Sequence, residues 1–305
     1  MAIPIFVLGR QRSGTTWLAN QLSEHPNIAA VRHEHHFGIH ESAYFSHVLD
    51  RYGDLKDKQN FSEFAEVMAA SDYLRIAGIS KEFLYALYPA SYEEVFRAVM
   101  DEVARQQGAT HWLEKTPHNT LNANLLATVY PTAKFVAVTR EVHDVVKSAL
   151  YMPPAEARLR RLYRSAVSWA HYTKAIESFC ERQPERTLSV QYASLREDLA
   201  GTLQEICSFL ALPYDPCLLQ QSYRPNTSFT GGRKREASNL SAGERAFVDS
   251  LVRATELTPL AVFDWRRRRQ RRAKIPKSLP TWFFSMSPFY TEGGDARDER
   301  PSGGD

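Results

Sequence analysis

The fold of this chain is decided by residues 3–16, which read IPIFVLGRQRSGTT. The apolar stretch at residues 3–8 predicts a buried strand, and the turn that runs from Gly9 to Gly14 leads into a helix. A glycine-rich turn of this kind points backbone N–H groups, and the positive end of the helix dipole, at one anionic site. The segment therefore predicts a phosphate-binding loop, or P-loop, at the end of a strand.

The loop departs from the nucleotide triphosphatase pattern at one position. Those enzymes place Lys directly after the second glycine, where it reaches the β- and γ-phosphates, and then Ser or Thr for magnesium. Thr15 occupies the Lys position here, and the nearest cation is Arg12 within the loop. We therefore expect Arg12, Ser13, Gly14, Thr15 and Thr16 to hold a terminal phosphate without the charge that a triphosphate requires.

Further short apolar runs follow the same pattern along the chain. Residues 134–139 and 187–190 predict buried strands that each lead into a helix, and residues 28–31 and 111–113 are shorter candidates. Strands that lead into helices are typical of parallel sheets with crossover helices on both faces. We expect an α/β protein with a P-loop-like three-layer fold, in which helices flank a central parallel sheet. The longer helices are expected at roughly residues 155–182, 195–211 and 241–257.

The domain organisation follows from where the strands stop. We expect one main domain at residues 1–275 and a C-terminal extension at residues 276–305, disordered from about residue 293, where small and charged residues dominate. Residues 41–108 form a helical insertion rich in aromatic residues. Such an insertion beside a phosphate site is suited to bind an acceptor, but aromatic residues at helical spacing also form ordinary core, and both interpretations stay open.

The composition limits the class of protein. The chain has 305 residues, of which 43% are hydrophobic and 24% charged, so it can bury a full core. No stretch is long and apolar enough to span a bilayer, and the first expected strand leaves no room for a signal peptide, so we expect a cytoplasmic protein that is not an integral membrane protein. The net charge of +3 is too small to favour nucleic acid as the main partner. The six arginines at residues 266–272 are interpreted as a solvated helix end, with an acidic partner or membrane surface as the alternative.

Metal and disulfide chemistry are not expected. The cysteines are odd in number and lack Cys-x-x-Cys spacing, which argues against a disulfide framework and against a zinc knuckle. The histidines cluster near the end of the second expected strand without the His-Glu-x-x-His pattern, so we expect no metal site. These residues are Cys180, Cys207 and Cys217, and His33, His35, His36 and His40.

Four polar residues lie where ligands of open α/β sheets bind. Arg140 follows the strand at residues 134–139, and Ser148 comes eight residues later, about two helical turns along the next helix. This pair is suited to grip a second phosphate. Glu34 and Lys115 follow two other short apolar runs, so we expect both side chains to project toward the same crevice.

These motifs together resemble the sulfotransferases that use 3′-phosphoadenosine 5′-phosphosulfate (PAPS) as donor, over about residues 3–263. Residues 12–16, followed by His25 and Pro26, are similar to the 5′-phosphosulfate loop of protein-tyrosine sulfotransferases. Residues 134–150 are similar to the 3′-phosphate motif of the family. Residues 32–37 and 114–117 are similar to two segments of the Golgi carbohydrate sulfotransferases.

The resemblance implies roles for individual residues. It makes Glu34 the base that takes the acceptor proton, with His33, His35 and His36 as alternatives, and it makes Arg12 and Lys115 the cations at the reacting group. Tyr192 is implied as a contact of the adenine, with core packing as the other interpretation. Ser228, Arg233 and Lys234 are implied in a loop that closes over the 3′-phosphate, although the glycine that follows this motif in cytosolic members is absent here.

The function implied is transfer of a sulfuryl group from PAPS to a hydroxyl or amine by in-line displacement, with 3′,5′-adenosine bisphosphate (PAP) as product and no metal. The acceptor is a small molecule, a carbohydrate or a peptide. Two alternatives are a P-loop kinase-like phosphotransferase and a catalytically silent nucleotide-binding protein. Thr15 in place of Lys argues against the kinase, and the joint presence of Glu34 and Lys115 argues against the silent protein.

Overall fold

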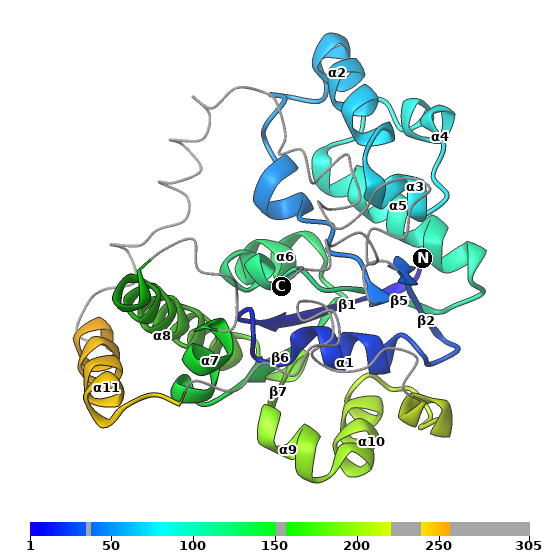
Figure 1. Cartoon of the computed structure of the whole chain (residues 1–305). Helices are drawn as coiled ribbons and strands as arrows, with labels where there is room; N and C mark the ends of the chain where they lie inside the picture. The colour runs from blue at the N-terminus through cyan, green and yellow to red at the C-terminus, as the bar shows by residue number, and fades with distance from the viewer. Residues whose placement is uncertain (35–37, 151–156, 221–238, 257–305) are drawn as a thin grey trace, which may run out of the picture.

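The computed structural model describes residues 1–34, 38–150, 157–220 and 239–256 (Figure 1). The expected His35, His36, Ser228, Arg233 and Lys234 therefore lie outside the described residues. The same holds for the basic run at residues 266–272 and for the C-terminal extension.

A five-stranded parallel sheet forms the centre of the described structure, as the sequence predicted. Its strand order is β2-β5-β1-β6-β7, so β1 is the middle strand. Parallel pairing aligns Ile3 of β1 with His111 of β5 and Ile5 with Lys134 of β6. The strands are β1 (Ile3–Gly9), β2 (Ile28–Ala30), β5 (His111–Glu114), β6 (Lys134–Thr139) and β7 (Thr187–Gln191).

Two hydrophobic cores cover the two faces of the sheet because successive strand residues point to opposite sides. Phe6 and Leu8 of β1 belong to one core, and Ile5 and Val7 belong to the other. Figure 1 shows α5 and α6 on one side of β1, and α1, α9 and α10 on the other. The resulting three layers confirm the predicted fold class.

The helices agree with the expected ranges except in one place. Residues 195–211 were expected to form a single helix, but the structure has two, beginning at Tyr192 and broken at Asp198. Asp198 takes a non-helical conformation, and its side chain accepts a hydrogen bond from the Gly201 N–H, which starts a new helix instead of continuing the first. Outside the insertion, the α-helices are α1 (Thr15–Leu22), α6 (Ala123–Val129), α7 (Val142–Leu150), α8 (Arg158–Arg182), α9 (Tyr192–Glu197), α10 (Leu199–Phe209) and α11 (Ala242–Glu256).

Short elements complete the described part. The sequence did not predict a two-stranded antiparallel ladder of β3 (Arg32–His33) and β4 (Gly38–Ile39), in which each strand has only two residues. The 3-10 helices are η3 (Pro117–Asn122), η4 (Pro184–Arg186) and η5 (Pro216–Leu219). No helix in the described ranges is long and apolar enough to cross a bilayer.

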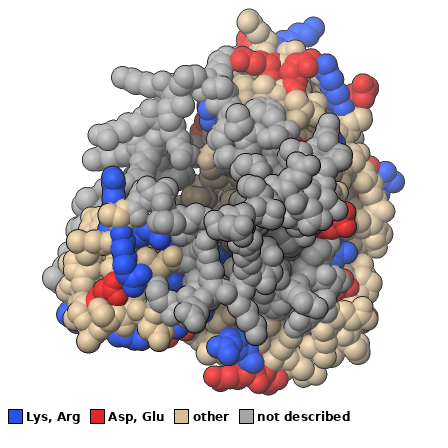
Figure 2. Space-filling view, viewed as in Figure 1, with Lys and Arg blue, Asp and Glu red and all other residues tan. Residues whose placement is uncertain are grey.

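The insertion at residues 41–108 is helical, and most of its aromatic rings form core. Phe45, Phe61 and Phe64 are almost completely buried and join the core that covers one face of the sheet. Figure 2 shows basic and acidic side chains beside one another over these helices, at the top of the view. Lys81 and Glu66 of the insertion form an ion pair (2.6 Å). The elements are η2 (Tyr44–Val48), α2 (Lys58–Ala69), α3 (Asp72–Ile76), α4 (Lys81–Ala86) and α5 (Tyr92–Gln106).

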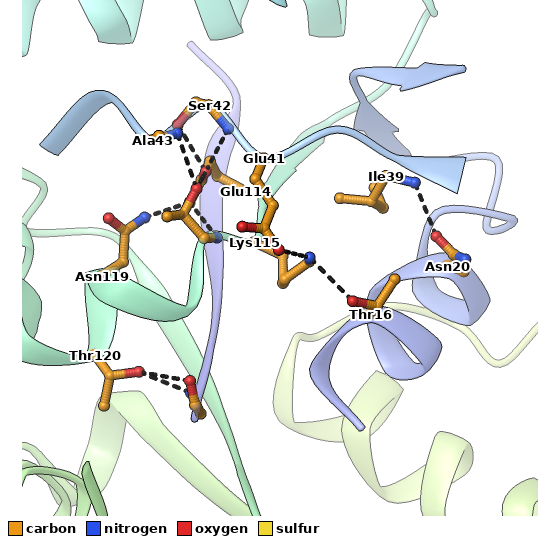
Figure 3. Close-up of polar contacts among 12 residues, drawn as sticks. Thr16, Asn20, Ile39, Glu41, Ser42, Ala43, Glu114, Lys115, Asn119 and Thr120 are labelled. Carbon is orange, nitrogen blue, oxygen red and sulfur yellow. Dashed lines mark hydrogen bonds and ion pairs between the residues drawn. The ribbon is translucent and has the colours of Figure 1, made fainter. Parts of the chain in front are cut away.

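A buried carboxylate joins the start of this insertion to the sheet. Glu114, the last residue of β5, accepts hydrogen bonds from the Ser42 hydroxyl (2.7 Å) and from the Thr116 hydroxyl (2.6 Å). It also accepts from the Ser42 N–H (3.3 Å), the Thr116 N–H (3.2 Å) and the Asn119 amide. The Thr116 hydroxyl oxygen in turn accepts from the Ala43 N–H (3.1 Å). Figure 3 shows Glu114 at the centre of these contacts, so residues 42 and 43 are fixed at the end of β5.

We expect Phe6→Ala to lower the free energy of unfolding by about 3–5 kcal/mol, because it leaves a cavity at the centre of the sheet. Phe6 is fully buried, and the rings of Phe45, Trp112, Tyr130 and Phe135 lie 5.4–6.4 Å from its ring. Urea unfolding measures the loss.

Ile3→Ala is the matched control for Phe6→Ala, because Ile3 lies on the same strand and is 38% exposed. It should cost about 1 kcal/mol or less. Equal losses in the two variants would contradict the assignment of Phe6 to the centre of the core.

We expect Glu114→Gln to destabilise the protein most at low pH. Burial raises the pKa of Glu114 above its ordinary value of 4.5. At pH values between the unfolded and the folded pKa, the folded protein therefore keeps a proton on Glu114 that the unfolded chain releases. The stability that this proton contributes is fully present below the unfolded pKa and is lost as the pH rises through the folded pKa. Urea unfolding at a series of pH values should therefore show the difference between wild type and variant shrinking as the pH rises.

The control for Glu114→Gln is Glu205→Gln, which changes an exposed carboxylate on α10. Its unfolding free energy should stay close to that of the wild type at every pH. A difference between wild type and Glu114→Gln that grows with pH would mean that the five hydrogen bonds hold Glu114 in its ionised form.

Candidate functional site

The loop between β1 and α1 has two positions whose backbone conformation favours glycine. Gly9 and Gly14 have φ angles of +149° and +97°, in the region that L side chains rarely adopt. A Cβ at Gly9 would meet the Thr15 methyl at 2.5 Å and the Val138 carbonyl oxygen at 2.8 Å, and a Cβ at Gly14 would meet the Tyr192 ring. The loop therefore lies tightly between α1, β6 and the start of α9.

The first turn of α1 is suited to receive an anion. The helix begins after Gly14, which has no side chain to cap it, and its first turn contains no acidic residue. N–H groups in the first turn of a helix have no partner within the helix, and the helix dipole adds positive potential there. A phosphate placed at this end supplies the missing acceptors.

The structure brings the loop and the end of β6 together. The Arg12 Nε donates to the Ser148 Oγ on α7 (2.9 Å), and the Arg140 Nη1 donates to the Arg12 carbonyl oxygen (3.1 Å). The Arg140 guanidinium also lies over the Tyr192 ring, 4.1 Å from its centroid. The predicted loop residue Arg12 and the predicted pair Arg140 and Ser148 thus share one site.

This site concentrates positive charge. Burial lowers the pKa of Arg12, and the neighbouring charge of Arg140 lowers it further. Burial also lowers the pKa of Arg10, to about 10, with Arg12 as a smaller repulsive contribution. Arg140 has Asp144 as an ion-pair partner, but at 3.9 Å and with the carboxylate 58% exposed, a pair that stabilises little. Such a cluster of cations is stabilised by a bound anion.

Lys115 reaches the same loop from β5. Its side chain is 2% exposed, and its Nζ donates to the Thr16 Oγ1 (3.1 Å) and pairs with the Glu41 Oε1 (2.5 Å). Figure 3 shows Thr16 and Glu41 pointing at this ammonium group from α1 and from the start of the insertion. Lys115 therefore lies at the loop, as its place after a strand suggested.

Glu34 and Tyr192 occupy different surroundings. Glu34 is exposed and directly follows β3, and its role as a base stays a prediction. Tyr192 packs against Gly14, Arg140 and the Trp17 ring, 5.8 Å away. Tyr192 is half-buried and belongs to neither hydrophobic core of the sheet, and its contact with adenine stays a prediction.

Sequence reasoning missed three residues at this site. Arg10 donates to the Gln11 carbonyl oxygen (2.8 Å) and to the Ser168 Oγ of α8 (3.4 Å). These hydrogen bonds connect the loop to α8. The Thr120 Oγ1 accepts from the Gly9 N–H (2.8 Å) and donates to the Gly9 carbonyl (3.2 Å), which fixes the end of β1. Glu41 meets Lys115 across 74 residues, and no local motif pointed to it.

The described residues contain no group of three or more His, Cys, Asp and Glu side chains arranged to hold a metal ion. The three cysteines are unpaired.

Two kinds of sulfotransferase are similar to this chain in sequence. A putative protein-tyrosine sulfotransferase of Caenorhabditis briggsae is 23% identical over 219 residues, which covers 70% of this chain and 68% of the relative. The omega-hydroxy-beta-dihydromenaquinone-9 sulfotransferase Stf3 of Mycobacterium tuberculosis is 25% identical over 283 residues, which covers 81% of this chain and 72% of the relative.

Solved sulfotransferase structures are also similar to this chain. The sulfotransferase domain from the curacin biosynthetic pathway is 20% identical with a TM-score of 0.49, covering 90% of this chain and 99% of that domain. Mouse sulfotransferase SULT7A1, solved with PAP, is 13% identical with a TM-score of 0.48, covering 89% of each chain.

The family assignment comes from the sequence match. Residues 4–216 match the model of the sulfotransferase family. The matched range includes β1 and its loop, Lys115 at the end of β5, and the Arg140 and Ser148 pair. The chain belongs to the sulfotransferase family.

Proposed function

We propose that this sulfotransferase uses PAPS as donor and transfers its sulfuryl group to a hydroxyl or amine acceptor. The observation that carries the proposal is the shared site of Arg12, Arg140 and Ser148, joined by hydrogen bonds of 2.9 and 3.1 Å. PAPS carries a phosphosulfate at its 5′ position and a phosphate at its 3′ position. A loop at a helix start and an adjoining arginine–serine pair offer two neighbouring anion sites for these groups.

The loop is assigned to the 5′-phosphosulfate. Gly14, Thr15 and Thr16 supply backbone N–H groups at the start of α1, and Arg12 adds a positive charge. Ser13 is assigned to the same group, although its own N–H donates to the Arg10 carbonyl oxygen (3.1 Å). Thr15 in place of a P-loop lysine matches a donor whose terminal group carries less charge than a γ-phosphate. This difference favours PAPS over ATP with magnesium. The absence of a metal from the reaction stays part of the proposal.

Arg140 and Ser148 are assigned to the 3′-phosphate. The Ser148 hydroxyl accepts from Arg12, so one hydroxyl links the two anion sites. Tyr192 supports the Arg140 guanidinium and is the proposed contact of the adenine. Ser228, Arg233 and Lys234 are proposed to close over the 3′-phosphate.

The chemistry needs positive charge where the leaving group forms. In sulfuryl transfer the acceptor atom bonds to sulfur while the bond from sulfur to the phosphate oxygen breaks, and the electron pair of that bond stays on the phosphate. Lys115 is positioned by Thr16 to stabilise this charge, and Arg12 is the second cation. Groups fixed in advance in a buried site stabilise developing charge more than water does, because they need not reorient. Bringing donor and acceptor together at the loop contributes further.

Of the two proposed kinds of acceptor, the names of relatives favour a hydroxyl compound over an amine. The names of the relatives specify tyrosine in proteins and an omega-hydroxy compound, and both carry a hydroxyl group. A small molecule, a carbohydrate and a peptide all remain within the proposal. We also propose that the protein acts in the cytoplasm, that nucleic acid is not its partner, and that it is not an integral membrane protein.

Binding of PAP tests the donor assignment. We expect Arg140→Ala and Ser148→Ala to weaken PAP binding, with Arg140→Ala about 10- to 100-fold weaker, because it removes a charge-assisted hydrogen bond worth about 1.5–3 kcal/mol. Isothermal titration calorimetry measures the dissociation constants of PAP and of ATP with magnesium for each variant. The wild type should bind PAP more tightly than ATP.

Arg105→Ala is the matched control for Arg140→Ala. Arg105 is an exposed arginine near the end of α5 and is paired with Glu102 (2.7 Å). The end of α5 leads to the start of β5, at the opposite end of the parallel strands from the loop. Its PAP affinity should equal that of the wild type. Tighter binding of ATP with magnesium than of PAP by the wild type would favour the kinase alternative instead.

A further inference from the structure

The ion pair of Lys115 with Glu41 places a carboxylate beside the proposed reaction site. The Glu41 Oε1 lies 2.5 Å from the Lys115 Nζ, and the same Nζ lies 3.1 Å from the hydroxyl of Thr16 in the phosphate-binding loop. The ammonium group thus bridges Glu41 and the loop. Figure 3 shows this row of Thr16, Lys115 and Glu41.

The ammonium group allows an acid to lie this close to an anionic donor. An ammonium group has three N–H donors, and Thr16 and Glu41 together accept two of them. The third can be given to the sulfuryl group when the donor is bound. Lys115 then attracts both the Glu41 carboxylate and the sulfuryl group of the donor. Without Lys115, the carboxylate would repel the donor.

Glu41 is fixed in place by the residues that follow it. Ser42 and Ala43 are hydrogen-bonded to Glu114 and Thr116 at the end of β5. The backbone at residue 41 therefore moves with the sheet that carries Lys115. A base must be held within hydrogen-bond reach of the proton that it takes, and this connection provides such positioning.

The exposure of the pair differs in a way that suits proton transfer. The Lys115 side chain is 2% exposed, whereas the Glu41 side chain is 43% exposed. The Glu41 Oε1 thus faces the buried cation, while part of the Glu41 side chain is open to solvent. The exposed part also lets the proton pass to water after each reaction.

We propose that Glu41, rather than Glu34, is the catalytic base that takes the acceptor proton. This inference rests on the proposed function. The acceptor O–H bond breaks and its proton goes to Glu41, while the acceptor oxygen bonds to sulfur. The bond from sulfur to the 5′-phosphate oxygen breaks, and PAP leaves with that electron pair. Lys115 stabilises the leaving oxygen and holds the Glu41 side chain at the site through their ion pair.

Glu34 is the alternative base, and the two carboxylates can be separated by substitution. Glu41→Gln keeps the shape and a hydrogen-bond acceptor for Lys115 but cannot take a proton. Glu41→Asp keeps the acid on a shorter side chain. Glu34→Gln tests the other carboxylate, and Glu205→Gln on α10 is the exposed control.

The experiment measures PAP release from PAPS with phenol as the acceptor probe, and PAP affinity by calorimetry. We expect kcat for Glu41→Gln to fall at least 100-fold, within the range that general-base catalysis contributes, while its PAP affinity stays equal or becomes tighter. Glu41→Asp should recover part of kcat, and Glu205→Gln should match the wild type. PAP affinity distinguishes a lost base from a damaged site, because a damaged site binds PAP more weakly.

Different outcomes overturn different claims. If Glu41→Gln keeps the kcat of the wild type, or if Glu34→Gln alone abolishes turnover, Glu41 is not the base. If kcat for Glu41→Gln stays near that of the wild type and only Glu41→Ala loses activity, Glu41 merely positions Lys115. If the wild type neither binds PAP nor releases it from PAPS, the proposed function itself is wrong.

Discussion

The site depends on a steric constraint at the end of the central strand. Gly9 and Gly14 have backbone angles and close neighbours that exclude a side chain, so the turn from β1 to α1 can pass between β6 and Tyr192. The Thr120 hydroxyl binds both the N–H and the carbonyl of Gly9 and fixes the start of the turn. Because β1 lies in the middle of the sheet, the turn is surrounded by the ends of β5 and β6, which carry Lys115 and Arg140.

The position of this turn also concentrates positive charge at the site. The turn gathers Arg10, Arg12 and Arg140, and burial lowers the pKa of the first two. Burying several cations together costs free energy unless an anion binds beside them. The fold therefore favours binding of a ligand with separated negative groups. Lys115 extends this positive region to the start of the helical insertion, where Glu41 balances it. The sheet and the insertion therefore meet at the point where donor and acceptor are proposed to meet.

The sequence was sufficient for the parts that local patterns determine. Apolar runs before turns located all five strands of the sheet, and the glycine spacing located the loop. It was not sufficient where a contact between distant residues decides. The pair of Glu41 with Lys115 spans 74 residues, and Glu41 stands in no motif. The break at Asp198 was missed because a side-chain cap competes there with an otherwise continuous helical pattern. The aromatic residues of the insertion allowed two interpretations, and only packing showed that most form core.

The central claim is that one site holds both phosphate groups of a single adenine nucleotide. A crystal structure of the protein with PAP bound tests it most directly. We predict that the 5′-phosphate lies on the N–H groups of residues 14–16 and that the 3′-phosphate contacts the side chains of Arg140 and Ser148. A complex in which the nucleotide reaches the loop while Arg140 and Ser148 contact no part of it would contradict the claim.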